Sequence, residues 1–154
     1  MWRELGVNWL LECWTVRERG IALYGPNPKS LITPIPPVRL VEVVRERLAD
    51  WLAYANTVDD PGWRSHLGEM RYTVETMCRA LYTLATHELC GKPSAVRWAL
   101  ETLPEPWHAL VVRSQSWRVG VPVGEAVSAE VRAFVRWVAR RAEPNWESTP
   151  STRS

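Results

Sequence analysis

The chain has 154 residues, 46% of them hydrophobic, and its ten tryptophans supply enough apolar surface for one domain with a buried core. A net charge of +2 is too small for the basic face that nucleic-acid binding needs, so no DNA or RNA partner is expected. Cys13, Cys78 and Cys90 are odd in number and widely spaced, which is typical of a reducing compartment and indicates a cytoplasmic protein.

The first predicted helix covers residues 6–19 and ends at Gly20, which occupies the position of a helix C-cap. Its apolar residues recur every three to four positions: Val7, Leu10, Leu11 and Trp14. Glu12 interrupts this run, so it is neither a signal peptide nor a membrane-spanning helix, and no other segment reaches membrane length. Residues 21–36 are rich in proline and are therefore expected to form an extended loop that cannot be helical.

The middle of the chain predicts two long helices. Pro37 opens a helix that runs to about Ala55, because proline is well suited to the first helical turn. A polar turn follows over residues 56–62. The longest periodic segment then covers roughly residues 65–89, and Pro93 breaks it.

Shorter helices complete the predicted fold. One runs through Trp98 to Leu103, and the next begins at the following prolines and carries Trp107 and Trp117. A last helix covers about 125–141, and the remaining residues, 142–154, are expected to be a disordered tail. The predicted fold class is all-α, an antiparallel bundle of five or six helices with a short N-terminal extended segment.

No motif of phosphoryl or nucleotidyl transfer is found in the sequence. No two acidic residues are separated by a single residue, as carboxylates that share a metal on one strand would be, and the eight glycines form no phosphate-binding loop. His87 and Cys90 are too few ligands for zinc, so neither a metal site nor a catalytic residue is predicted. Spacing alone leaves a Cys–His nucleophile open, but Cys78 lies beside a buried stripe, where thiols are inert. No arginine precedes a histidine by four to six residues, as one class of helical nucleases requires.

The long helix over residues 65–89 has two distinct faces. One carries a core stripe of Met70, Val74, Met77, Leu81 and Leu84. The other carries Tyr72, Glu75, Arg79, Tyr82, Thr83 and Thr86, which is too aromatic for a merely solvated face and indicates a ligand or domain contact. From spacing alone, Glu75 and Arg79 are expected to form a structural i,i+4 ion pair. Lys92 likewise fits a cation that offsets the dipole at a helix C-terminus.

Four blocks in order along the chain resemble the aminoglycoside adenylyltransferases that modify streptomycin and spectinomycin. They are IALYGP at 21–26, CRALYT at 78–83, GKP at 91–93 and RWALETLP at 97–104. The resemblance covers the C-terminal helical domain of that family, here roughly residues 8–120.

The resemblance implies a division of the chain. Members of the family begin with a nucleotidyltransferase domain, which carries a Gly-Ser and paired-aspartate motif for magnesium and a glutamate base, and all of this would precede Met1. Residues 1–36 then correspond to the last piece of that domain and a linker, residues 37–141 to the helical substrate-binding domain, and residues 142–154 to the tail. The chain is expected to be a truncation, an isolated domain or a derivative that lost its catalysis.

The resemblance also implies the site residues. Arg79 and Lys92 match an arginine and a lysine that contact the nucleotide, which favours a functional role for both. If they meet one triphosphate, their charged groups lie within about 10 Å of each other and are at least partly exposed. The family's aromatic residue near the end of the next helix falls on Trp117 or Arg118.

Trp51 matches a tryptophan that packs on streptomycin, but Asn56 stands where an aspartate is expected five residues later. Asp59 or Asp60 can take its place. Aminoglycosides are polycations with an apolar ring edge, so Trp51, Trp63, Asp59 and Asp60 would together supply a stacking wall and attracting charge.

The implied function is a helical domain that contacts substrate and nucleotide in an aminoglycoside O-nucleotidyltransferase, which transfers AMP from ATP to a drug hydroxyl. The domain is not catalytic alone. ATP and magnesium are expected only with a complementary catalytic domain, and neither on this chain by itself. The expected partners are an aminoglycoside and either a catalytic nucleotidyltransferase domain or a second copy of the chain, with no membrane involved. The alternative is a non-enzymatic helical module that binds a protein through Tyr72 and Tyr82.

Overall fold

The computed structural model describes residues 2–57, 60–64 and 66–143. In these ranges the chain forms seven α-helices, one 3-10 turn and no strand, which confirms the predicted all-α helical bundle. The helices, in chain order, are α1 (Trp2–Arg19), α2 (Pro28–Leu31), α3 (Pro37–Ala55), α4 (Leu67–Thr86), α5 (Lys92–Thr102), α6 (Trp107–Ser114) and α7 (Glu125–Arg141), with the 3-10 turn η1 (Pro61–Arg64) between α3 and α4.

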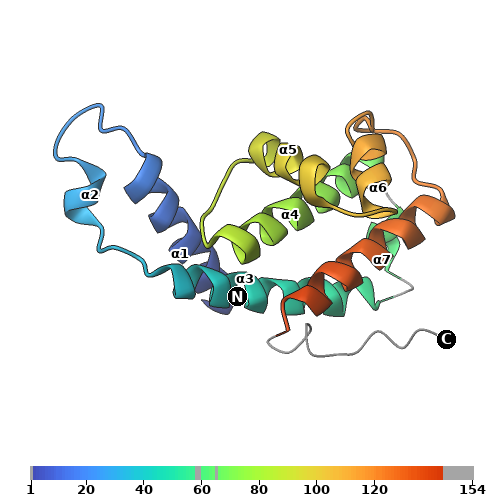
Figure 1. The fold of residues 1–154 in the computed structure, drawn as a ribbon, viewed down its shortest axis with the longest axis horizontal. Coiled ribbons are helices and arrows are strands. Elements are labelled where there is room, and N and C mark those ends of the chain that lie inside the picture. Colours follow the sequence, from blue (N-terminus) through green and yellow to red (C-terminus); the bar gives the residue numbers. More distant parts are fainter. Residues whose placement is uncertain (1, 58–59, 65, 144–154) are drawn as a thin grey trace.

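Helix α4 is the centre of the bundle, since it packs against α3, α5, α6 and α7. Figure 1 shows α4 and α7 running opposite to α3, while α5 and α6 cover the other side of α4. The predicted core stripe of α4 is confirmed, because Val74 and Met77 are fully buried and Leu84 packs against the core at its edge. The largest fully buried side chains come from several elements: Trp63, Phe134, Leu40, Leu48, Met77 and Leu110.

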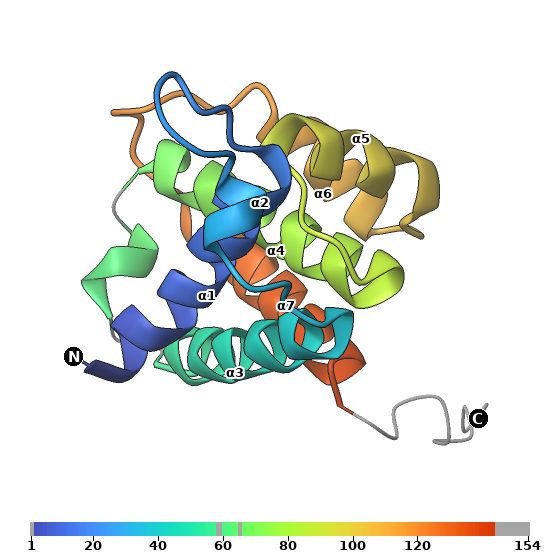
Figure 2. The same ribbon diagram turned by 90° about the vertical axis from the view of Figure 1, so that its left-hand side faces the viewer.

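Helices α1 and α2 lie at one end of the bundle, in front in Figure 2. The prediction that residues 21–36 cannot be helical is wrong for Pro28–Leu31, which form one helical turn. Asn27 caps this turn, because its side chain accepts a hydrogen bond from the backbone N–H of Lys29 at 2.9 Å, and Pro28 fits the first helical position.

Helix α4 is shorter than the sequence predicts. It ends at Thr86 instead of 89, because His87 adopts the left-handed conformation with φ of 59° and donates its N–H to the Thr83 carbonyl at 2.8 Å. Helix α6 ends at Ser114, so Trp117, which was expected on this helix, follows it in a turn. The prediction that the disordered tail begins at Ala142 is wrong for this residue, which caps α7 and is buried in the core. Glu143 is exposed, and residues 144–154 of the predicted tail lie outside the described residues.

Candidate functional site

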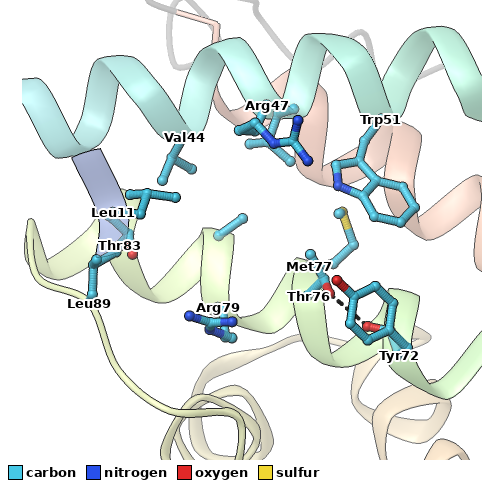
Figure 3. A pocket seen from close by; sticks show the side chains of 12 residues that line it. Leu11, Val44, Arg47, Trp51, Tyr72, Thr76, Met77, Arg79, Thr83 and Leu89 are labelled. Carbon is cyan, nitrogen blue, oxygen red and sulfur yellow. Dashed lines mark hydrogen bonds between the residues drawn. The ribbon is translucent and has the colours of Figure 1, made fainter. Parts of the chain in front are cut away.

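A cavity of about 170 Å³ opens between α1, α3 and α4 (Figure 3). Its apolar lining comes from Leu11, Val44, Leu48, Met77, Ala80 and Leu89, and its polar lining from Arg47, Trp51, Tyr72, Thr76, Arg79 and Thr83. Arg47 and Trp51 reach into it from α3, and Tyr72 and Arg79 come from α4 on the facing side. The packing of α3 against α4 therefore brings together two predicted site residues, Trp51 and Arg79, that are 28 positions apart in the sequence.

Trp51 also borders a second, shallower hollow of about 280 Å³ on α3, whose other lining residues are Arg47, Asp50 and Tyr54. The Trp51 and Tyr54 rings meet edge to face with centroids 6.1 Å apart. The Asp50 carboxylate is largely exposed here and lies 3.8 Å from the Arg47 guanidinium. An aromatic surface and a carboxylate thus lie side by side at this end, as binding of a cation with an apolar edge requires.

Trp63 and Asp60 lie behind Tyr54. Trp63 is only 1% exposed, its indole N–H donates to the Tyr54 carbonyl at 3.1 Å, and its ring stacks on the Tyr54 ring at 4.6 Å, so it supports the hollow without lining it. Burial raises the pKa of the Tyr54 hydroxyl, and the charges of Asp60 and Glu69 raise it further. Asp60 therefore lies near Tyr54, whereas Asp59 lies outside the described residues.

Asn56 is the C-cap residue of α3 and is held by α7. Its side-chain oxygen accepts a hydrogen bond from the Arg136 Nε at 2.9 Å, and the same guanidinium donates to the Ala55 carbonyl at 3.0 Å. The position at which the resemblance leads one to expect an aspartate is therefore occupied by a neutral amide whose oxygen already binds an arginine.

The expected ion pair between Glu75 and Arg79 is wrong. Glu75 is buried, at 8% exposure, and its carboxylate instead accepts a hydrogen bond from the Arg71 Nε at 2.8 Å and lies 3.6 Å from the Lys92 ammonium. The Lys92 ammonium also lies 4.4 Å from the centre of the Tyr72 ring. Tertiary packing explains why Glu75 has these partners: α5 packs along α4, so the start of α5 covers the turn of α4 that carries Glu75.

Lys92 is the first residue of α5, so its expected place at a helix C-terminus is wrong as well. A cation is unfavourable next to the positive end of a helix dipole, and here Glu75 and the face of Tyr72 offset that cost. Arg79 is exposed and donates its Nε–H to the carbonyl of Cys90 at 3.1 Å, two residues before Lys92. Both cations are at least partly exposed, as expected. Arg79 lines the cavity, whereas Lys92 does not line it and lies against the ring of Tyr72, which does.

The second face of α4 is less open than the sequence suggests. Thr83 is 1% exposed, and Tyr82 is partly buried with its ring edge-on to Trp98 at 5.8 Å. Of the two candidates for the family's aromatic position, Trp117 packs against the core and Arg118 is exposed. Arg47 and Tyr54 were not predicted from the sequence, because their only signal is their spacing of four and three residues from Trp51 on one helix.

Cys78 is fully buried, and burial, followed by the nearby charge of Glu75, raises the pKa of its thiol to about 12. The thiol is therefore protonated at neutral pH and does not act as a nucleophile. Within residues 2–57, 60–64 and 66–143, no three His, Cys, Asp or Glu side chains gather as metal ligands would. No helix in these same ranges combines the length and the apolar character that crossing a bilayer requires.

Comparisons with known proteins give the family of the chain. Residues 30–141 match the family described as aminoglycoside adenylyltransferase, C-terminal domain. The chain is 28% identical to an aminoglycoside (3'') (9) adenylyltransferase of Escherichia coli and 30% identical to one of Klebsiella pneumoniae, in each case over 79% of this chain and 44% of the relative. It is also 26% identical to a spectinomycin 9-adenylyltransferase of Campylobacter jejuni, over 84% of this chain and 47% of that protein.

The chain thus spans less than half the length of the curated relatives that it matches. The family match extends from the end of α2 to the last residue of α7 and so includes every helix of the bundle core. The chain therefore belongs to the family of aminoglycoside adenylyltransferase C-terminal domains.

Proposed function

We propose that this chain is the substrate-contacting part of an aminoglycoside O-nucleotidyltransferase, which holds the triphosphate of ATP and the drug for a catalytic domain acting in the cytoplasm. The observation that carries the proposal is the cavity between α3 and α4, since it places Trp51 and Arg79 on facing helices. The names of the relatives support the choice of ATP-dependent adenylyl transfer to an aminoglycoside.

The nucleotide end of the proposed site consists of Arg79 and Lys92. Arg79 uses one N–H on the Cys90 carbonyl, and an arginine has four more to offer. The Lys92 ammonium has three donors, and Glu75 and the ring of Tyr72, which lines the cavity, hold it in place. If the charged groups of Arg79 and Lys92 lie within about 10 Å of each other, one polyphosphate can accept charge-assisted hydrogen bonds from both.

The drug end of the proposed site is the hollow around Trp51 and Tyr54. Asp50 lines this hollow and Asp60 lies near Tyr54, so both carboxylates would attract a polycation, while Trp51 supplies a flat apolar wall. Trp63 contributes through Tyr54, on which it stacks, rather than by touching the drug. Asn56 carries no charge, so the streptomycin-type contact implied by an aspartate at this position would have to come from neighbouring acids.

In this proposal residues 37–141 form the substrate-binding domain, and residues 1–36 lead to the catalytic domain, which binds magnesium and activates the drug hydroxyl. ATP with magnesium binds stably only when both domains are present. The alternative, a helical module that binds a protein partner, is favoured by a different observation: Ile21, Leu23 and Tyr24 are 87%, 98% and 100% exposed. A homodimer seen by light scattering, with these side chains protected from solvent, would support the alternative.

The nucleotide end can be tested through the two lysines of the chain, Lys29 and Lys92. Labelling lysine with ¹³C at Cε gives two signals in NMR spectra, and Lys29→Arg assigns them. We expect ATP at millimolar concentration to shift the Lys92 signal, adenosine to leave it in place, and neither to move the Lys29 signal. An unmoved Lys92 signal, or an equal response to adenosine, would remove the triphosphate from this end.

The drug end can be tested by replacing all ten tryptophans with 5-fluorotryptophan and recording ¹⁹F NMR spectra. The signal that disappears in the Trp51→Phe variant is that of Trp51. Streptomycin and spectinomycin should shift the Trp51 signal with a dissociation constant around 1 mM, or about −4 kcal/mol, because half a site gives weak binding. A drug response that leaves the Trp51 signal unchanged would place the drug elsewhere.

A further inference from the structure

Arg19, the last residue of α1, lies beside Arg79 at the segment that joins α4 to α5. A terminal nitrogen of Arg19 donates to the carbonyl of Leu89 at 2.9 Å, and the Nε of Arg79 donates to the carbonyl of Cys90 at 3.1 Å. Successive Cα atoms are about 3.8 Å apart, so the two guanidinium groups are anchored to neighbouring points of one short segment. Both also line the same small hollow of about 100 Å³, together with Trp14, Thr15 and Gly91.

The charges of this pair are not balanced by acids. Among the described residues, neither Arg19 nor Arg79 has a carboxylate within ion-pair distance, while the nearby Glu75 is taken by Arg71 and Lys92. Cys90 lines the same hollow as both arginines, so their charges oppose the rise that burial causes in the pKa of its thiol. Two like charges held this close repel each other, and an anion bound between them would remove that repulsion.

The hydrogen-bond donors of the two arginines fit a phosphate group better than they fit an anion with a single acceptor atom. Each guanidinium is a planar fork with five donors, of which the structure uses one on a backbone carbonyl. The remaining donors match the two-oxygen face of a phosphate group, which arginine binds in a bidentate manner.

We propose that Arg19 is a further phosphate-binding residue, which forms with Arg79 an arginine pair that holds one phosphate group of the nucleotide triphosphate. The choice of ligand rests on the proposed function, whereas the pair itself rests on the contacts of α1. Arg19 precedes residues 30–141, the range of the family match, so that match assigns it no role. Helix α1 thus contributes two residues to the proposed site: Leu11 lines the main cavity, and Arg19 lines the hollow at the phosphate end.

A merely structural Arg19 would behave differently. It would fasten α1 to the Leu89 carbonyl and rest on the Trp14 ring, which is 5.9 Å away, and its loss would lower stability without changing selectivity among ligands. A phosphate-binding Arg19 makes affinity depend on the phosphate chain of the ligand. The distinguishing measurement is therefore affinity for tripolyphosphate and ATP compared with adenosine.

The experiment titrates the intact 154-residue chain, ¹³C-labelled at lysine, with tripolyphosphate, ATP and adenosine, and follows the Lys92 signal. The variants are Arg19→Gln, Arg19→Lys and Arg79→Gln, and Arg140→Gln on exposed α7 surface is the control for net charge. We expect Arg19→Gln to weaken tripolyphosphate and ATP binding about tenfold, Arg19→Lys to recover part of this loss, and Arg140→Gln to have little effect. Circular dichroism of each variant verifies that the chain is folded at the titration temperature.

The outcomes separate the two proposals. If the wild-type chain responds to ATP and Arg79→Gln weakens the response, while Arg19→Gln equals Arg140→Gln, the arginine pair is overturned and the proposed function stands. If the wild-type Lys92 signal responds to neither ATP nor tripolyphosphate, the nucleotide end of the proposed function fails, and Arg19 with it. An Arg19→Lys variant that binds tripolyphosphate as tightly as the wild-type chain would overturn the bidentate contact, because lysine cannot reproduce the fork.

Discussion

At the scale of single residues, the charge of Glu75 decides how the cations of α4 and α5 are arranged. Its side chain is only 10% exposed, and burying a carboxylate is costly unless cations compensate it. Arg71 and Lys92 do so, and both keep about two fifths of their side chains exposed to water. Glu75 thus holds Lys92 in place, while Arg79 keeps its charge available to a ligand.

We predict that Glu75→Gln lowers the free energy of unfolding by roughly 1 to 2 kcal/mol, as measured by urea denaturation at pH 7. The amide still fits, but Arg71 and Lys92 then face each other without a counter-charge. The loss stays below the 3 to 5 kcal/mol typical of a fully buried pair because the two cations remain solvated.

Glu42→Gln is the matched control for this change. Glu42 pairs with Arg39 on the surface of α3, where the two side chains are 43% and 50% exposed, so its loss should cost less than about 0.5 kcal/mol. Equal losses for the two variants would show that burial adds nothing to the Glu75 pair.

The sequence could not identify the partners of Glu75, because Arg71 and Arg79 are both four residues away from it. Helix rules favour the acid N-terminal to the base and so favour Arg79, whereas the structure pairs Glu75 with Arg71. The Cys90 carbonyl binds Arg79 from beyond the helix, a contact that no spacing within α4 contains. The face on which Arg79 lies was predictable, and its neighbours were not.

At the scale of elements, the end of α3 matters because Trp51 and the loop with Asp60 flank it. Arg136 of α7 donates to the Asn56 side chain and to the Ala55 carbonyl, and so satisfies an acceptor that the helix end leaves free. This contact ties the C-terminal helix to the drug end of the site.

We predict that Arg136→Ala lowers the free energy of unfolding by about 1 to 2 kcal/mol, since two hydrogen bonds from a charged donor are lost. Arg140→Ala, an exposed position one turn later on α7, should cost less than about 0.5 kcal/mol. Thermal unfolding followed by circular dichroism measures both. If the two variants unfold alike, the contact between α7 and the end of α3 adds no stability.

Elements whose ends are marked by proline or glycine were predictable, as the start of α3 at Pro37 and of α7 after Gly124 show. Helix α4 ends where no such residue stands, since His87 takes the left-handed conformation that glycine or asparagine usually adopts. The short helix α2 was missed for the opposite reason: prolines argued against helix, yet Pro28 at the first position after the Asn27 cap favours one turn.

At the scale of the whole molecule, α1 packs against the bundle at the cavity between α3 and α4. Leu11 closes the main cavity, and Arg19 reaches the connection between α4 and α5. The match to the family begins at residue 30, but the cavity depends on residues before it. The packing of α1 is therefore needed for the cavity, which the sequence blocks alone did not reveal.

We predict that the 154-residue chain alone transfers no AMP from ATP to an aminoglycoside. Metal-assisted nucleotidyl transfer needs carboxylates that hold magnesium against the attacking and leaving oxygens, and the sequence contains no pair of acids separated by one residue. In the described part of the chain no three potential ligands gather either. In the proposed function Arg79, Lys92 and Trp51 bind and orient substrates, but none of them can replace the metal.

The measurement is pyrophosphate release with ATP, magnesium and, in turn, streptomycin, spectinomycin and a kanamycin-type drug. Heat-denatured chain is the blank, and an authentic aminoglycoside adenylyltransferase shows that the assay works. We expect release equal to the blank with every drug. If pyrophosphate release exceeds the blank and Arg79→Gln abolishes it, this chain has a catalytic centre that does not use paired carboxylates. That result would contradict its assignment as the substrate-contacting part alone. Release that survives Arg79→Gln would in addition remove the nucleotide from the Arg79 end of the cavity.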